Sequence, residues 1–142
     1  MQLIVVGVDP GANTGIAWYV DGTLQKIESE ASLQALFFHL HIGIGLVVFE
    51  DSRLQTTFLR QANARAMLKI ARNVGEIDAY CKLIESECNR LSIKCIGISP
   101  KNKGAKLNSE DFMRLTGWTR KTNQHERDAA MVAYRFRNGA KL

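Results

Sequence analysis

The stretch VVGVDPGANTGIAW, residues 5–18, decides how the fold of this chain begins. The nearly continuous apolar run over residues 2–8 is typical of a central β-strand that is covered on both faces. This run ends in Asp9, and a Pro-Gly pair then turns the backbone before a second apolar stretch at 14–20. A carboxylate at the end of a buried strand raises the question of which group compensates its charge.

Turn and capping signals divide the remaining sequence into alternating strands and helices. Asp21-Gly22 is a hairpin signal, so we expect the second and third strands to be antiparallel. Asn123 is placed to cap the last helix while Glu126 returns the second bond of a capping box. The expected strands are 2–8, 14–20, a third from Thr23, 46–50 and 94–98, and the expected helices are one ending near His39 with Ser29 or Ser32 as its cap, a long one along 67–91, a short one capped by Ser109 and a last one from Asn123.

The strongest periodicity in the sequence lies in the long predicted helix. Apolar residues recur there in steps of three and four, which places them on one stripe of a helix of about 30 residues, or ~45 Å. A crossover helix packed on the sheet explains this stripe, and a contact between two copies of the chain explains it equally well. The stripe consists of Met67, Ile70, Val74, Ile77, Cys81, Ile84, Cys88 and Leu91.

The order of elements, β-β-β-α-β-α-β-α, predicts an α/β fold with a five-stranded mixed sheet flanked by helices. The leading hairpin requires antiparallel pairing, whereas the two later strands follow helical crossovers and are expected to be parallel. A length of 142 residues, with 46% hydrophobic and 23% charged residues, suits one domain over 1–142.

Composition also limits the class of protein. No apolar run approaches the ~20 residues of a membrane span, and no basic segment precedes the first strand as it would in a signal peptide. The three cysteines form no CxxC pair, which predicts reduced thiols in a cytosolic protein. Residues 1–50 contain one lysine against five carboxylates, whereas 51–142 contain 18 basic residues against nine acidic ones. Such a basic half indicates a polyanionic partner, and a solvated basic surface without a partner is the alternative.

Four side chains capable of holding metal ions are expected at one edge of the sheet. Asp9 and Glu50 each end a strand, and if these two strands are parallel neighbours, both side chains lie at the same sheet edge. His125 and Asp128 lie three residues apart on one face of the last helix. Carboxylates with one imidazole suit Mg²⁺ or Mn²⁺, and two such ions about 4 Å apart promote phosphodiester hydrolysis. Taken singly, each residue is explained as a turn residue, an edge acid or a first-turn helix residue.

Together these residues resemble the RuvC-type Holliday-junction resolvases of the RNase H-like, or retroviral integrase, superfamily. The matching segments, in chain order, are VGVDPGANTGIAW, VVFED, RNVGEIDAYCKLIESE, GISPKNKGAK and HERDAA. The resemblance covers essentially the whole chain and implies an RNase H-like fold. It further implies that Asp9, Glu50 and Asp128 are catalytic acids that bind two divalent ions. His125, which stands where many members have another Asp, would be a further ligand, a proton donor or a cation near the phosphate.

The resemblance also implies where DNA is contacted. Lys101, Lys103 and Lys106 lie in a segment where the family carries basic residues near the scissile strand. Phe58, eight residues after Glu50, is the nearest candidate for the aromatic side chain that the family inserts at the junction, although core packing explains it equally well. Further contacts with backbone phosphates are expected from Arg60, Arg65, Lys69 and Arg72.

The predicted function is therefore a divalent-metal endonuclease that resolves four-way DNA junctions and leaves 5′-phosphate and 3′-hydroxyl nicks. The resemblance implies a homodimer. The compact length and the lack of a targeting segment favour the cytoplasm of a bacterium or of a phage-infected cell. A broader nuclease for branched DNA or RNA–DNA hybrids would use the same residues, and an inactive nucleic-acid-binding module would share the fold. A sugar-kinase or actin-like ATPase needs two related domains, for which 142 residues are too few, so no nucleotide cofactor is expected.

Overall fold

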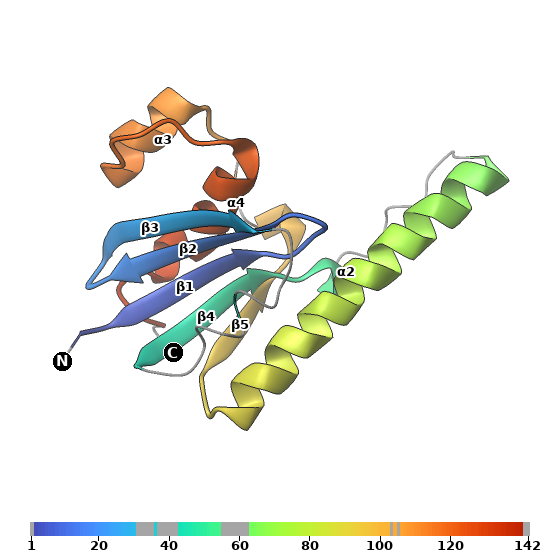
Figure 1. Cartoon of the computed structure of the whole chain (residues 1–142), viewed down its shortest axis with the longest axis horizontal. Coiled ribbons are helices and arrows are strands. Elements are labelled where there is room, and N and C mark those ends of the chain that lie inside the picture. The colour runs from blue at the N-terminus through green and yellow to red at the C-terminus, as the bar shows by residue number, and fades with distance from the viewer. Residues whose placement is uncertain are drawn as a thin grey trace.

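The centre of the protein is a mixed five-stranded sheet with the strand order β3-β2-β1-β4-β5 (Figure 1). The computed structural model describes residues 2–30, 36, 43–54, 63–102, 104 and 106–140. The β1, β2 and β3 strands are antiparallel neighbours, whereas β4 is parallel to both β1 and β5. The strands are β1 Ile4–Asp9, β2 Thr14–Val20, β3 Thr23–Glu30, β4 Ile44–Glu50 and β5 Cys95–Ile98. The predicted α/β fold with a mixed sheet is confirmed.

The β2–β3 hairpin has the turn that its sequence predicts. Asp21 and Gly22 both have positive φ angles, of 50° and 85°. Two consecutive residues in this region are what a tight hairpin of the Asp-Gly kind requires. The short helix predicted to end near His39 lies outside the described residues, apart from Leu36, which is helical and buried.

Three described α-helices surround the sheet, and each of them begins with an asparagine cap. The Asn123–Glu126 capping box is present at the last helix, as predicted. The short helix is capped by Asn108, whose side chain accepts the N–H of Asp111, so the prediction of Ser109 as the cap is wrong by one residue. The helices are α2 Ala64–Arg90, α3 Ser109–Thr116 and α4 Gln124–Ala133, with short 3-10 turns η1 Ser52–Leu54, η2 Pro100–Asn102 and η3 Tyr134–Phe136.

Each face of the sheet carries its own apolar core, because successive side chains of a strand point to opposite faces. One face packs against α4 and the other against the C-terminal half of α2. The α4 face includes Val5, Tyr19, Leu46, Val48, Ala129, Ala130 and Ala133. The α2 face includes Val6, Val8, Val47, Phe49, Cys81, Ile84 and Cys88. Helices on both faces were expected from the crossover pattern.

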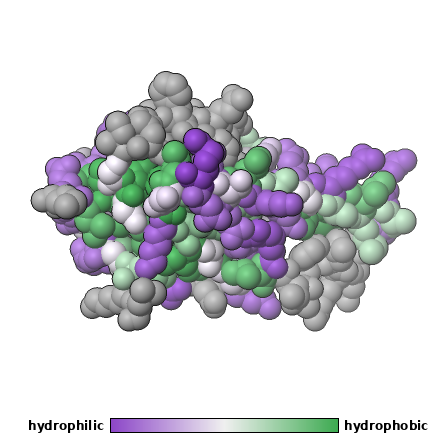
Figure 2. All heavy atoms as spheres, turned by 90° about the horizontal axis from the view of Figure 1, so that it is seen from below, coloured by the Kyte–Doolittle hydropathy of each residue, from purple (hydrophilic) through white to green (hydrophobic). Residues whose placement is uncertain are grey.

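Only part of the apolar stripe of α2 is used in this packing. Its fully buried residues are Cys81, Ile84 and Cys88, all in the C-terminal half. The N-terminal half extends away from the sheet, and Met67 and Leu68 there are 38% and 56% exposed (Figure 1). In the space-filling view this projecting end carries hydrophobic atoms among hydrophilic ones (Figure 2). Packing on the sheet therefore explains half of the stripe.

The three cysteines are free, with Cys81 and Cys88 buried and Cys95 half-buried, as expected for reduced thiols. Within the described part of the chain, no helix has the length and apolar character needed to cross a membrane.

Candidate functional site

The ends of β1 and β4 bring two carboxylates to one edge of the sheet. These strands are parallel, and the last residues paired between them are Val8 and Phe49. Asp9 and Glu50 are the next residues in this register, so they end the two strands side by side. Strand alternation places both on the face that α4 covers, in line with Val5 and Val48. The condition under which the sequence places both acids at one sheet edge, parallel pairing of their strands, is therefore met.

Two glycines allow α4 to lie unusually close to this part of the sheet. A Cβ atom on Gly7 would lie 2.2 Å from the carbonyl oxygen of Ala129, and one on Gly15 would lie 2.4 Å from that of His125. Gly15 is the cross-strand partner of Asp9. The backbone of His125 therefore lies against the strand position beside Asp9, and only glycine leaves room for it there.

Asp9, Glu50 and His125 line one cavity of about 430 Å³. This volume lies within the ~300–1,000 Å³ that is usual for ligand sites. The remaining walls come from the β1–β2 turn, α2 and the η1 and η2 segments, through Pro10, Gly11, Ala12, Asn13, Ser52, Val74, Ile77 and Pro100. Three candidate residues that are remote in the sequence thus border the same space.

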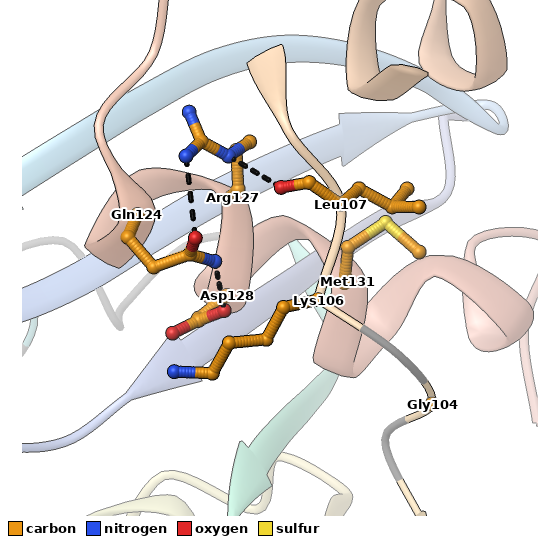
Figure 3. A pocket seen from close by; sticks show the side chains of 7 residues that line it. All are labelled: Gly104, Lys106, Leu107, Gln124, Arg127, Asp128 and Met131. Carbon is orange, nitrogen blue, oxygen red and sulfur yellow. Dashed lines mark hydrogen bonds between the residues drawn. The ribbon is translucent and has the colours of Figure 1, made fainter.

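Asp128 lines a smaller neighbouring pocket, in which its carboxylate accepts a hydrogen bond from Gln124 (Figure 3). The Gln124 side-chain amide donates to Asp128 Oδ1 at 2.7 Å. Arg127 in turn donates from Nη2 to Gln124 Oε1 at 3.2 Å and from Nε to the carbonyl oxygen of Leu107 at 2.9 Å. The side chain of Lys106 points toward the Asp128 carboxylate in Figure 3. This pocket joins the start of α4 to the segment before α3.

The donor set of these pockets is rich in oxygen, with an imidazole at its border, which suits Mg²⁺ or Mn²⁺. Among the described residues, no group of three or more His, Cys, Asp or Glu side chains is close enough together to hold a metal ion. Three of the four candidate ligands therefore border one cavity, whereas Asp128 borders the second pocket. The assignment of Asp9, Glu50, His125 and Asp128 as ligands stays a prediction.

An ion pair between the buried Asp51 and the exposed Arg53, next to the site, was not recognised in the sequence. Asp51 is only 5% exposed and accepts two hydrogen bonds from the Arg53 guanidinium, each 2.8 Å long. These bonds with Arg53 hold the pKa of the Asp51 carboxyl below its usual value. A Cβ atom on Gly97 would lie 2.7 Å from Asp51 Oδ2, so the carboxylate also packs tightly against β5.

Helix α2 holds the same segment through three of its side chains. Glu85 pairs with Arg53 at 2.6 Å, Asp78 accepts a hydrogen bond from Ser52 at 2.6 Å, and Cys81 Sγ donates to the Glu50 carbonyl oxygen at 3.6 Å. Positions 78, 81 and 85 share one face of the helix. The end of β4 and the turn after it are therefore fixed to α2 at three residues, Glu50, Ser52 and Arg53. The only local indication of the Asp51–Arg53 pair in the sequence is that Arg53 follows Asp51 by two positions.

The expected DNA-contacting residues fall into three groups. Arg65, Lys69 and Arg72 are exposed on the projecting half of α2. Lys101 is exposed in η2, and Lys106 borders the Asp128 pocket. Phe58, Arg60 and Lys103 lie outside the described residues.

The strand order, with an antiparallel β1–β2–β3 unit and parallel β4 and β5, defines an RNase H-like α/β fold. The structure of T. thermophilus RuvC in complex with a Holliday junction substrate has this architecture and aligns with 94% of this chain and 92% of its own, with a TM-score of 0.63. The two sequences are 16% identical, so the likeness establishes the fold alone. No family model and no curated protein sequence matches the chain.

Proposed function

We propose that this chain is a single-domain, divalent-metal-dependent endonuclease that resolves four-way DNA junctions and leaves 5′-phosphate and 3′-hydroxyl ends. The observation that carries the proposal is the cavity shared by Asp9, Glu50 and His125 at the carboxyl edge of β1 and β4. Support for the substrate comes from the fold that the chain shares with a RuvC bound to a Holliday junction. The basic composition of residues 51–142 favours the same class of partner.

The residues of the site divide into ligands and groups that contact the phosphate. Asp9 and Glu50 would hold the cations from rigid strand ends, with Asp128 held ready by Gln124. Two bound Mg²⁺ or Mn²⁺ ions would supply an activated water and stabilise the leaving oxygen. His125, at the border of the cavity, would complete the ligand set or donate a ring N–H to a phosphate oxygen.

Lys106 is favoured over Lys101 as a contact to the scissile phosphate. It borders the same pocket as Asp128, and its ammonium group points toward that carboxylate (Figure 3). A cation beside a metal-binding carboxylate is well placed to bind a phosphate oxygen that approaches the metal. Lys103 stays a candidate from the sequence.

The decisive variant is Asp9→Asn. It should abolish cleavage of labelled four-way junctions in Mg²⁺ and in Mn²⁺ while leaving junction binding largely intact, because it removes a ligand charge and keeps the side-chain volume. Asp21→Asn in the β2–β3 turn is the matched control, since an amide oxygen can still accept the Leu3 N–H there. Cleavage by Asp9→Asn at the wild-type rate would refute the assignment.

The substrate class is tested with a panel of junctions, flaps, linear duplexes and RNA–DNA hybrids, with the nick positions mapped. Symmetric nicks in the junction support resolution, whereas comparable cutting of flaps or hybrids indicates a broader nuclease. Salt-sensitive DNA binding without cutting in either metal indicates an inactive binding module.

We further propose that two copies associate through the projecting half of α2. This half exposes Met67 and Leu68, and the apolar stripe continues along it through Ile70 and Val74 beyond the contact with the sheet. A pair of sites would allow two opposed strands of one junction to be cut. Light scattering of the purified chain tests the oligomeric state. The predicted location, the cytoplasm of a bacterium or of a phage-infected cell, stays a prediction.

A further inference from the structure

The loop that joins α3 to α4, residues 117–122 with the sequence GWTRKT, is not used by the site described above. Thr119, Arg120 and Lys121 are exposed within it. The loop leads directly into the start of α4, where His125 borders the candidate cavity. Because Lys121 precedes His125 by four residues, their Cα atoms lie within roughly 14 Å of each other.

Both ends of this loop are held by the rest of the fold. Gly117 ends α3 in the left-handed conformation at φ 76°, and its N–H donates to the Met113 carbonyl oxygen. Trp118 is half-buried and packs on the core of the α4 face. At the other end, Thr122 donates to Ser109 Oγ at 3.4 Å, and its carbonyl oxygen accepts a hydrogen bond from Arg127.

The same contacts connect the loop to the candidate site. The Arg127 guanidinium that binds the Thr122 carbonyl also donates to Gln124, and Gln124 donates to Asp128. Loop and carboxylate are therefore held by one hydrogen-bonded group. A surface that is already ordered loses little conformational entropy when a partner binds.

The loop presents two cations outward. The Arg120 guanidinium lies over the Trp118 ring, 5.0 Å from its centroid, which fixes its position and leaves its N–H groups available at the edge. In the part of the chain that the structure describes, neither Arg120 nor Lys121 pairs with a carboxylate. By contrast, Arg90 is paired with Glu87 and Arg114 with Asp111.

We infer that loop 117–122 is a phosphate-binding surface for the duplex arm next to the cleaved strand. For its substrate class this inference rests on the proposed function. Phosphates follow one another by about 3.4 Å along the axis of each strand, so a reach of roughly 14 Å spans about four nucleotides from the cavity. Contacts of this kind position the backbone and carry no sequence information.

The test compares two double variants that remove the same charge. Arg120→Ala/Lys121→Ala removes both loop cations, and Arg90→Ala/Lys94→Ala removes two exposed cations at the α2–β5 connection. The measurement is the affinity for a four-way junction without divalent ions, over a series of salt concentrations. Each lost phosphate contact should lower the magnitude of the slope of log K against log salt by about 0.9. For two lost contacts, the affinity for the junction at ~0.1 M salt should therefore fall roughly 60-fold.

The control pair should leave that slope within error of wild type. Equal slopes for the loop pair and the control pair would overturn the inference, because the two loop cations would then contribute no more to binding than two other exposed cations. Single-turnover cleavage at saturating enzyme should stay near the wild-type rate in the loop pair. A fall in that rate with unchanged binding would also overturn it.

The two proposals fail separately. If the loop double variant lowers the salt slope of junction binding but wild type does not cut junctions, the nuclease proposal fails and the loop inference stands. If wild type cuts junctions while the loop pair keeps the full salt slope, the loop inference fails alone. Urea unfolding of both double variants verifies that each is folded.

Discussion

Gly15→Ala should separate α4 from the sheet at the point where the candidate site is assembled. The added Cβ would lie 2.4 Å from the His125 carbonyl oxygen and 3.0 Å from the Ala129 Cβ. Ordinary contact begins near 3.4 Å, so the start of α4 must move by about 1 Å. Neither neighbour is a flexible side chain that can turn aside, so backbone movement is the only relief.

Both the stability and the activity of Gly15→Ala follow from that displacement. Overpacking of this kind costs about 1–3 kcal/mol of unfolding free energy. A shift of about 1 Å in a reacting group can lower a rate by about 10²-fold, so junction cleavage should fall by roughly that factor even in protein that is fully folded. Urea unfolding measures the first quantity, and single-turnover junction cleavage well below the unfolding midpoint measures the second.

Gly75→Ala is the matched control, because a Cβ atom there has no neighbour within 4 Å. The position lies inside α2, where alanine is favoured over glycine by about 0.8–1.0 kcal/mol. The control should therefore be slightly more stable than wild type and cut normally. If Gly15→Ala unfolds and cuts as wild type does, α4 does not lie against Gly15 as described, and the shared cavity is not the active site.

Two further predictions concern the segments that hold the site. Arg53→Leu should lower the unfolding free energy by about 1–3 kcal/mol at neutral pH, because it removes both hydrogen bonds that the guanidinium donates to the buried Asp51 carboxylate. Since Arg53 depresses the folded-state pKa of Asp51, this stabilisation is complete above the unfolded pKa of about 3.9 and disappears as the pH falls through the lower folded value. Urea unfolding across pH should show the gap between wild type and variant closing in acid, and a gap that persists there contradicts the prediction. Asn123→Ala removes the acceptor of the Glu126 N–H in the capping box and should cost about 1 kcal/mol, measurable by thermal unfolding, whereas Asn138→Ala, outside the helix, is the control.

The features that the sequence predicted well have causes that are local or topological. Asp21-Gly22 carries its turn type in two residues, and the Asn123–Glu126 box needs only a spacing of three. The sequence placed Asp9 and Glu50 at the ends of two strands, and their adjacency depended on the parallel pairing of β1 with β4 that the structure shows.

The features that sequence reasoning missed depend on partners that are distant in the chain or equivalent in type. Arg53 forms an ion pair with Glu85, which is more than thirty residues away in the sequence, and no periodicity indicates such a pair. Asn108 and Ser109 are both good caps, and only the backbone geometry selects Asn108. The stripe of α2 shows that one face is apolar but not which half the sheet covers.

Because the end of β4 is attached to α2, movement of the projecting half of this helix is coupled to the candidate site. Its fixed point is the group of contacts that begins at Asp78, and the free arm back to Ala64 is about 21 Å long at 1.5 Å per residue. A tilt of only 10° or so about that point would carry the tip by roughly 4 Å, given the same rise per residue. Any force applied to the tip by a second molecule is consequently transmitted to the backbone of Glu50.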